Sequence, residues 1–315
     1  MMLDLRSPDV TVAFAVSTLE MDHGSGDLYT ARGLGAALER LLGWTVRYLP
    51  PDHWSETRDV DVFVAMRDDV DIGKAHEVNP ALVSVAWMRN WLELWVERPW
   101  FDQVSLQLCS SARGAGYVQS RTGVTPALLP IAVSLEQFRP GPPVEAYACD
   151  YVFTGNYWLN APPRDIERLD PSILPYRFRV FGRKWRKHPS FAPYAGGFVP
   201  YDDLARAYNS APITVDDSVT HTTKLWGSVN SRVFEALAAG SLVVTNNAIG
   251  SEELFGGRLP VWSDAAELVR LVRHYLEHPD ERLALLSELR REVLTEHSYD
   301  RRAQQFVDLL QARAG

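Results

Sequence analysis

Residues 228–245 read Ser-Val-Asn-Ser-Arg-Val-Phe-Glu-Ala-Leu-Ala-Ala-Gly-Ser-Leu-Val-Val-Thr, and this stretch decides the fold of the second half of the chain. Its apolar residues recur at helical spacing and form one face, made by Val233, Phe234, Leu237 and Ala238. Gly240 ends the helix, and a buried strand over 241–245 begins at once. The turn from helix to strand is therefore very tight, as it is in proteins built from alternating strands and helices.

Short apolar strands alternate with helical patterns on both sides of this stretch. The other predicted strands cover 10–17, 45–49, 60–66, 82–87, 105–108, 151–154, 177–181 and 212–215. Helical patterns cover 28–41 and about 202–209, and after residue 264 the chain is predicted to be helical to its end. The Pro-Gly-Pro-Pro run at 140–143 is the best candidate for a linker. We therefore expect an α/β protein with domains over 1–143 and 144–298, and a C-terminal helix over 299–315 that packs back on the N-terminal domain.

Composition and charge exclude several classes of protein. The 315 residues are 46% hydrophobic and 23% charged, which is typical of a folded soluble protein and excludes intrinsic disorder. No apolar run reaches the roughly 18 residues that span a bilayer, and no basic-then-apolar leader opens the sequence, so we expect a cytoplasmic protein. The net charge of −8 argues against nonspecific nucleic-acid binding but allows a local basic pocket. Cys109 and Cys149 are too few for a disulfide framework and are predicted to be buried, with a reactive thiol as the alternative.

A glycine-containing loop follows the first strand, at the place where a dinucleotide-binding fingerprint would lie. Gly24 and Gly26 stand where the fingerprint begins, but Tyr29 occupies the position of its third glycine. The second strand, 45–49, ends without an acidic residue that could hold a ribose hydroxyl. This argues against a nicotinamide or flavin enzyme, and the loop is either a tight turn or a place where the backbone approaches a ligand.

The start of the helix in 228–245 carries polar groups. A helix N-terminus offers free backbone N–H groups and a partial positive charge, which suit a phosphate. A carboxylate one turn further on, such as Glu235, can accept two hydrogen bonds from a ribose diol. Asn230 and Arg232 complete a candidate nucleotide site, and a solvated helix start is the alternative.

The motifs of the second half resemble those of the group 1 glycosyltransferases, and most of all the branch typified by CgeB-like, spore-maturation-type enzymes. The donor-site helix of that family is similar to residues 230–245. The resemblance continues over 150–156, 180–185, 201–208, 252–255, 262–268 and 297–302, and is faint before residue 150.

This resemblance implies a GT-B architecture, in which two Rossmann-like domains face a cleft and the second holds a nucleotide-diphosphate sugar. Carried over, Glu235 binds the ribose, while Asn230 and Arg232 shape the diphosphate and sugar pocket. The turn after the first strand of that domain approaches the donor. Fixed cations neutralise the departing diphosphate. The candidates for these last two roles are Gly155, Asn156, Arg164, Arg183, Lys184 and Lys224, although Arg183 and Lys184 could also be plain surface charges.

Two features bear on the chemistry. Retaining members of the wider group often carry a second glutamate eight residues before the ribose-binding one, and here that position is Gly227, so the stereochemical outcome is open. The family needs no catalytic metal and no cofactor, and no metal site is predicted. The acidic pairs at 68–69 and 216–217 are interpreted as turn or strand-end acids rather than cation ligands.

The general base is expected in the first domain, and Asp22 and His23 are its candidates, with a solvated loop pair as the alternative. Asp27 is interpreted as a helix cap, with Ser25 as the other candidate for that position. His221 could contact the transferred sugar, or it is simply a loop histidine.

Four tryptophans, at 87, 91, 95 and 100, stand close together, three of them at i, i+4 spacing. Core packing or a protein interface is one explanation, and a platform for the sugar rings of an acceptor is the other.

The sequence thus predicts a metal-independent glycosyltransferase that moves a sugar from a nucleotide-diphosphate sugar to an acceptor hydroxyl. A nucleotide-sugar epimerase on the same fold and a non-catalytic binding module are the alternatives. Donor sugar, base, acceptor and oligomeric state are not predicted.

Overall fold

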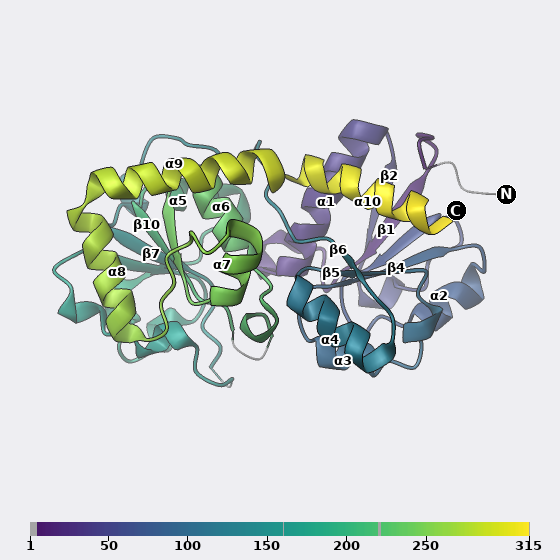
Figure 1. Cartoon of the computed structure of the whole chain (residues 1–315), viewed down its shortest axis with the longest axis horizontal. Coiled ribbons are helices and arrows are strands. Elements are labelled where there is room, and N and C mark those ends of the chain that lie inside the picture. The colour runs from purple at the N-terminus through teal and green to yellow at the C-terminus, as the bar shows by residue number, and fades with distance from the viewer. Residues whose placement is uncertain (1–4, 160, 220–221, 315) are drawn as a thin grey trace. The chain divides into compact units, whose positions relative to one another are not determined.

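The computed structural model describes residues 5–159, 161–219 and 222–314 and divides into two α/β units (Figure 1). The first unit runs to Ala132 and resumes at Ser298, and the second spans Val133–His297. The chain therefore passes from one unit to the other before the proline-rich run at 140–143, and returns between the last two helices.

The sheet of the first unit is parallel throughout, in the order β2-β1-β3-β4-β5-β6. Its strands are β1 (Thr11–Ala15), β2 (Thr45–Leu49), β3 (Val62–Ala65), β4 (Val83–Met88), β5 (Leu106–Cys109) and β6 (Ala127–Leu128). Its helices are α1 (Gly26–Leu42), α2 (Ile72–Val78), α3 (Leu92–Val96), α4 (Ala112–Thr122) and α10 (Tyr299–Ala314). The inner strands are buried on both faces, which explains why they are apolar without alternation.

The last helix, α10, lies beside α1 in the first unit (Figure 1). Tyr299, Phe306 and Leu310 enter the same apolar core as β1 and β3. Gly33 of α1 makes the contact possible, because a Cβ at that position would lie 2.2 Å from the ring of Tyr299. A helix far away in the sequence therefore completes the core of the first unit.

The second unit holds another parallel sheet, in the order β11-β10-β7-β8-β9. Its strands are β7 (Tyr151–Thr154), β8 (Phe178–Phe181), β9 (Ala195–Gly197), β10 (Ile213–Asp216) and β11 (Leu242–Thr245). Its helices are α5 (Leu204–Asn209), α6 (Ser231–Ala239), α7 (Ala248–Phe255), α8 (Ala265–Glu277) and α9 (Pro279–Glu296). The longer strands agree with the sequence prediction, whereas β6 and β9 are too short to give a periodic signal.

The tryptophan cluster does not lie along one helix, although three of its members have i, i+4 spacing. Trp87 belongs to β4, is fully buried and donates from Nε1 to the carbonyl of Leu129 at 2.8 Å. Trp95 and Trp100 are also buried and pack edge to face, with ring centroids 6.1 Å apart. Core packing explains these three residues, whereas Trp91 is 39% exposed.

Both cysteines are buried, and burial raises the pKa of the Cys149 thiol to about 12. The Cys149 thiol therefore lacks the low pKa that marks reactive cysteines. No helix among the described residues is long and apolar enough to cross a bilayer.

Candidate functional site

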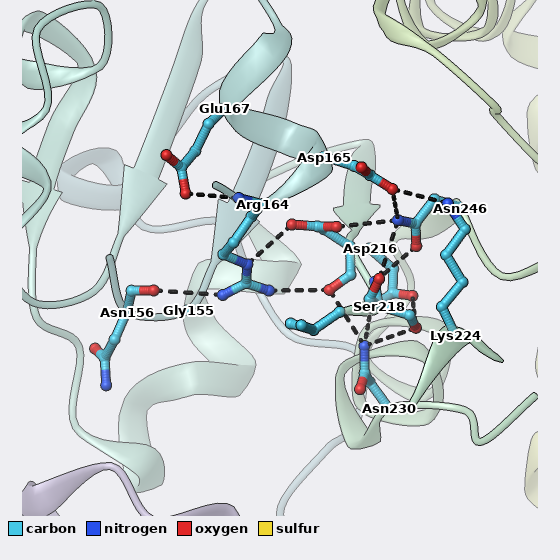
Figure 2. Close-up of polar contacts among 12 residues, drawn as sticks. Gly155, Asn156, Arg164, Asp165, Glu167, Asp216, Ser218, Lys224, Asn230 and Asn246 are labelled. Atoms are coloured by element: carbon cyan, nitrogen blue, oxygen red, sulfur yellow. Dashed lines mark hydrogen bonds and ion pairs between the residues drawn. The ribbon is translucent and has the colours of Figure 1, made fainter. Parts of the chain in front are cut away.

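Loops from several strands meet at the carboxyl edge of the second sheet, where helix α6 also begins (Figure 2). Parallel strands all end at the same edge, and ligands of such sheets bind there. The sequence-predicted residues gathered at this edge are Gly155 and Asn156 after β7, Arg183 and Lys184 after β8, and Asn230 and Arg232 at the start of α6. The structure adds Asp216, Asp217 and Ser218 at the end of β10 and Asn246 after β11.

Asp216, the last residue of β10, is fully buried and organises the first turn of α6. Its carboxylate accepts from Arg232 Nη1 at 2.6 Å, from Asn230 Nδ2 at 2.9 Å and from Thr245 Oγ1 at 2.7 Å. Arg232 also donates from Nε to the carbonyl of Thr154 at 2.7 Å. One buried carboxylate thus ties the helix start to the ends of β7 and β11, and it fixes the side chains of Asn230 and Arg232.

Arg164 and Asp217 form a buried ion pair beneath the loop that follows β7. Arg164 Nε donates to Asp217 Oδ2 at 2.9 Å, and Nη1 donates to the carbonyl of Asn156 at 3.3 Å (Figure 2). Its guanidinium lies over the rings of Phe153 and Trp158. Burial lowers the pKa of Arg164 and raises that of Asp217, and each charge stabilises the other. Arg164 was predicted to contact phosphate, but at 7% exposure its contacts are those of a residue that positions the Asn156 turn.

A second ion pair holds the loop before α6. Lys224 Nζ donates to Asp165 Oδ2 at 2.7 Å, and Asn246 Nδ2 donates to the same oxygen at 2.9 Å. Asn246 also accepts from the backbone N–H of Ser218 at 2.6 Å. Burial alone would raise the pKa of Asp165, but the hydrogen bonds from Lys224 and Asn246 hold it below its usual value. Three predicted phosphate cations, at 164, 224 and 232, are therefore each paired with a carboxylate of the same unit.

The turns after β7 and β8 touch each other because both contain glycine. Gly155 and Gly182 each have φ of +148°, a conformation that other residues rarely adopt. A Cβ on Gly182 would lie 2.0 Å from the carbonyl oxygen of Gly155. The contact is reinforced by Asn156 Oδ1, which accepts from the backbone N–H of Arg183 at 2.8 Å. Glycine at both turns therefore brings Arg183 to the same edge as the start of α6.

Arg183 and Lys184 are both exposed. Arg183 lies 4.0 Å above the ring of Phe198. Lys184 has a left-handed backbone, with φ of +71°, which is uncommon for a lysine. Among the described residues, no carboxylate lies within ion-pair distance of Lys184. Both predicted cations therefore lie at the surface of the second unit.

Glu235 lies one turn into α6 and is 3% exposed. Its carboxylate accepts from the hydroxyl of Tyr201 at 3.0 Å and from that of Tyr208 at 3.4 Å. Burial raises the pKa of Glu235 to about 7, although these hydroxyls and Arg232 act in the opposite direction. The predicted ribose-binding carboxylate is thus an acid whose ionisation falls close to neutral pH.

The predicted general-base candidates lie in the first unit, in the turn after β1. Asp22 and His23 are exposed, and His23 Nδ1 hydrogen-bonds Ser25 Oγ at 2.8 Å. The prediction of Asp27 as a helix cap is wrong, because Ser25 occupies the cap position and Asp27 lies inside α1. The Asp27 carboxylate accepts instead from the N–H of Ser17 at 2.6 Å and from its hydroxyl at 2.8 Å, which ties the loop after β1 to the helix.

Several residues of the site escaped the sequence analysis. The sequence patterns do not indicate Asp165, Asn246, Tyr201 or Tyr208, and they indicate the acids at 216–217 only as turn or strand-end residues. The position of Asp216, Asp217 and Asn246 directly after predicted strands of one parallel sheet could have indicated that they belong to the site. The predicted sugar contact His221 lies outside the described residues.

Comparison with known proteins extends this picture. Residues 164–308 match the sequence model of the family described as glycosyl transferase-like. No curated protein matches the chain.

Among solved structures, the chain is similar to Anabaena HepE in complex with UDP-glucose, with a TM-score of 0.67 at 11% identity over 96% of this chain and 99% of the other. AviGT4, a glycosyltransferase involved in avilamycin A biosynthesis, gives a TM-score of 0.61 at 15% identity over 97% and 98%. The DNA modifying enzyme β-glucosyltransferase gives 0.58 at 12% identity over 97% and 99%. At these identities the likeness concerns the fold.

The predicted GT-B fold, two parallel-sheet α/β units with a helical C-terminal region, is confirmed by these structures. Together with the glycosyl transferase-like pattern over residues 164–308, it confirms glycosyltransferase as the predicted enzyme class.

Proposed function

We propose that the second unit binds a nucleoside-diphosphate sugar at the carboxyl edge of its sheet, and that the protein transfers the sugar to an acceptor hydroxyl. The observation that carries this proposal is the convergence at one edge of exposed cations, a helix start and a buried carboxylate. Arg183 and Lys184 supply the positive charge, α6 supplies free backbone N–H groups, and Glu235 supplies the acceptor for a ribose diol. Few ligands other than a nucleotide need all three.

The chemistry assigned to each group follows from its surroundings. Transfer of the sugar breaks its bond to the diphosphate, which leaves with additional negative charge. Exposed cations held on a rigid loop stabilise that charge without reorganising during the reaction. The Gly155–Gly182 contact and the Trp185 Nε1 hydrogen bond to the Gly155 carbonyl, 2.6 Å long, hold the Arg183 loop in place.

The acids at this edge do not suggest a metal requirement. Asp216 and Asp217 are each paired with an arginine, and Asp165 with Lys224. A divalent cation would have to displace a buried arginine to reach the first two carboxylates, at considerable cost. We therefore propose transfer without a metal or a resident cofactor.

We further propose uridine as the base to test first, since a structural relative is described in complex with UDP-glucose. The motifs over 150–156 and 230–245 support a place near the CgeB-like branch. The proposed general base is His23 or Asp22, and the proposed location of the protein is the cytoplasm.

Binding of UDP and UDP-glucose, measured by calorimetry, tests the donor site. Arg183→Ala should weaken binding about tenfold or more, because a charge-assisted hydrogen bond to phosphate contributes about 1.5–3 kcal/mol. Arg186→Ala is the matched control, since Arg186 is an exposed arginine three positions further along the chain. Equal effects of the two variants would contradict the assignment of Arg183. Absence of binding by UDP and by other nucleoside diphosphates at millimolar concentration would contradict the proposed function.

A further inference from the structure

The first unit places an arginine at the carboxyl edge of its sheet, with no counter-ion among the described residues. Arg89 follows β4 directly and is partly buried. Its Nη2 donates to the carbonyl of Met66 at 2.8 Å, and Nη1 donates to Thr30 Oγ1 at 3.4 Å. Its Nε is buried and has no hydrogen-bond partner among the described residues. No described carboxylate lies within ion-pair distance of this guanidinium.

The neighbouring charges are already paired with other groups. Arg67 donates to both oxygens of Asp69, at 2.8 and 2.6 Å, and Arg98 pairs with Asp68. Asp27 is near enough to favour the charged form of Arg89, but both of its oxygens accept hydrogen bonds from Ser17. Of the three arginines at this edge, Arg89 alone is without a described carboxylate partner.

Burial makes this arrangement costly. Loss of water lowers the pKa of Arg89, yet a guanidinium stays charged in proteins. A partly buried cation with an unsatisfied N–H is destabilised unless an anion completes it. The printed acceptors of Arg89 are neutral oxygens, and no described carboxylate offsets its charge, so the uncompensated charge of the guanidinium indicates an oxyanion as the missing partner.

The place of this guanidinium in the fold is also that of a ligand site. In the order β2-β1-β3-β4, the chain turns from one side of β1 to the other, so the crevice lies between the ends of β1 and β3. Met66, which accepts from Arg89, follows β3, and its own N–H donates to the carbonyl of Ala15 at the end of β1. Thr30 belongs to α1, the helix that follows β1. Arg89 thus reaches from β4 to this switch point.

Trp91 adds an independent observation in the same loop. It is 39% exposed and has φ of +53°, in the left-handed region that a bulky residue rarely adopts. Backbone strain of this kind clusters at ligand sites, and an exposed indole suits the face of a sugar ring. An oxyanion contact and an aromatic surface thus stand two residues apart.

We infer that the first unit binds an acceptor sugar that carries a carboxylate or a phosphate, and that Arg89 binds this anionic group. The inference names the acceptor class and so rests on the proposed glycosyl transfer.

The test is binding of matched sugars to the full-length protein in the presence of saturating UDP, which keeps anions away from the donor cations. Glucuronic acid and glucose 6-phosphate are compared with glucose by ligand-observed NMR. Both anionic sugars, or one of them, should bind about tenfold or more tighter than glucose. Tighter binding of glucuronic acid would indicate a carboxylate acceptor, and tighter binding of glucose 6-phosphate would indicate a phosphate acceptor. Arg89→Gln should abolish the preference, and Arg89→Lys should keep part of it.

The controls separate this inference from the proposed function. Arg89→Gln must keep the UDP affinity of the wild type, which shows that the protein is folded, and Arg183→Ala must keep the preference for anionic sugars. Equal binding of glucose and both anionic sugars to the wild type would overturn the inference, whatever the variants do. An unchanged preference in a folded Arg89→Gln variant would overturn it as well. If no nucleotide binds but the Arg89-dependent preference is present without UDP, the proposed function fails and the anion site stands.

Discussion

Titration of Glu235 gives the sharpest test of the site. The carboxyl group is 3% exposed and is held between the hydroxyls of Tyr201 and Tyr208. Burial raises its pKa from an ordinary 4.5 to about 7, because the ionised form has lost its water. At pH 6 the folded protein therefore holds a proton that the unfolded chain has released.

The sign and size of the effect on stability follow from this difference. Between pH 4.5 and pH 7 the folded state binds more protons at Glu235 than the unfolded state, so stability falls as the pH rises through that window. At about 1.36 kcal/mol per pH unit, the loss amounts to about 3 kcal/mol, and it is complete above pH 7. Glu235→Gln removes the titrating group and keeps a side chain of similar shape.

Two measurements check this prediction. In protein labelled with ¹³C at glutamate side chains, the carboxyl resonance that disappears in Glu235→Gln should titrate with a midpoint near 7. In urea unfolding from pH 4.5 to 8, the variant should gain about 3 kcal/mol relative to the wild type across the range. The exposed Glu252, changed to Gln, is the control and should show no such trend. A midpoint near 4.5, or a difference in stability that does not depend on pH, would refute the reasoning.

The same protonation should also affect donor binding. If the Glu235 carboxylate accepts the ribose hydroxyls, the proton must leave before UDP binds. The affinity for UDP should then fall up to about tenfold for each pH unit below 7, and in Glu235→Gln it should be weaker and insensitive to pH over this range. An affinity of the wild type that is constant between pH 5 and 8 would contradict the assigned role while leaving the titration intact.

Three further predictions concern the architecture of the units. Gly182→Ala should destabilise the second unit by more than about 2 kcal/mol in urea unfolding, because the added Cβ meets the carbonyl of Gly155 at 2.0 Å and φ is +148°. A near-neutral change in stability would show that the two turns are not in contact. Arg164→Met should cost about 3–5 kcal/mol by leaving Asp217 buried and unpaired, and the double change with Asp217→Leu should recover most of that loss; additive losses would exclude the ion pair. Phe306→Ala should cost about 3–5 kcal/mol in thermal or urea unfolding of the first unit, since the ring of Phe306 is buried in the apolar core of that unit. A cost below about 1 kcal/mol would mean that α10 is not part of this core.

The sequence allowed much of the secondary structure to be predicted, because apolar periodicity is a local property. The helix over 231–239 and its following strand agree closely with the pattern of 228–245. The i, i+4 spacing of three tryptophans does not mark a helix, because Trp87 lies in β4 and Trp91 has a left-handed backbone. Spacing describes a helix only if the backbone between the residues is helical, and here it is not.

What the sequence by itself determined is the longer strands, several of the helices, the two α/β units, and the kinds of side chain at the start of α6. What only the tertiary structure decided is the state of those side chains. The ion pairs of Arg164 with Asp217 and of Lys224 with Asp165 join residues more than fifty positions apart. They exist because β7 and β10 are neighbours in the sheet, and strand order leaves no trace in local periodicity. The burial that raises the pKa of Glu235 likewise depends on Tyr201 and Tyr208 packing over α6, which no spacing within the helix could indicate.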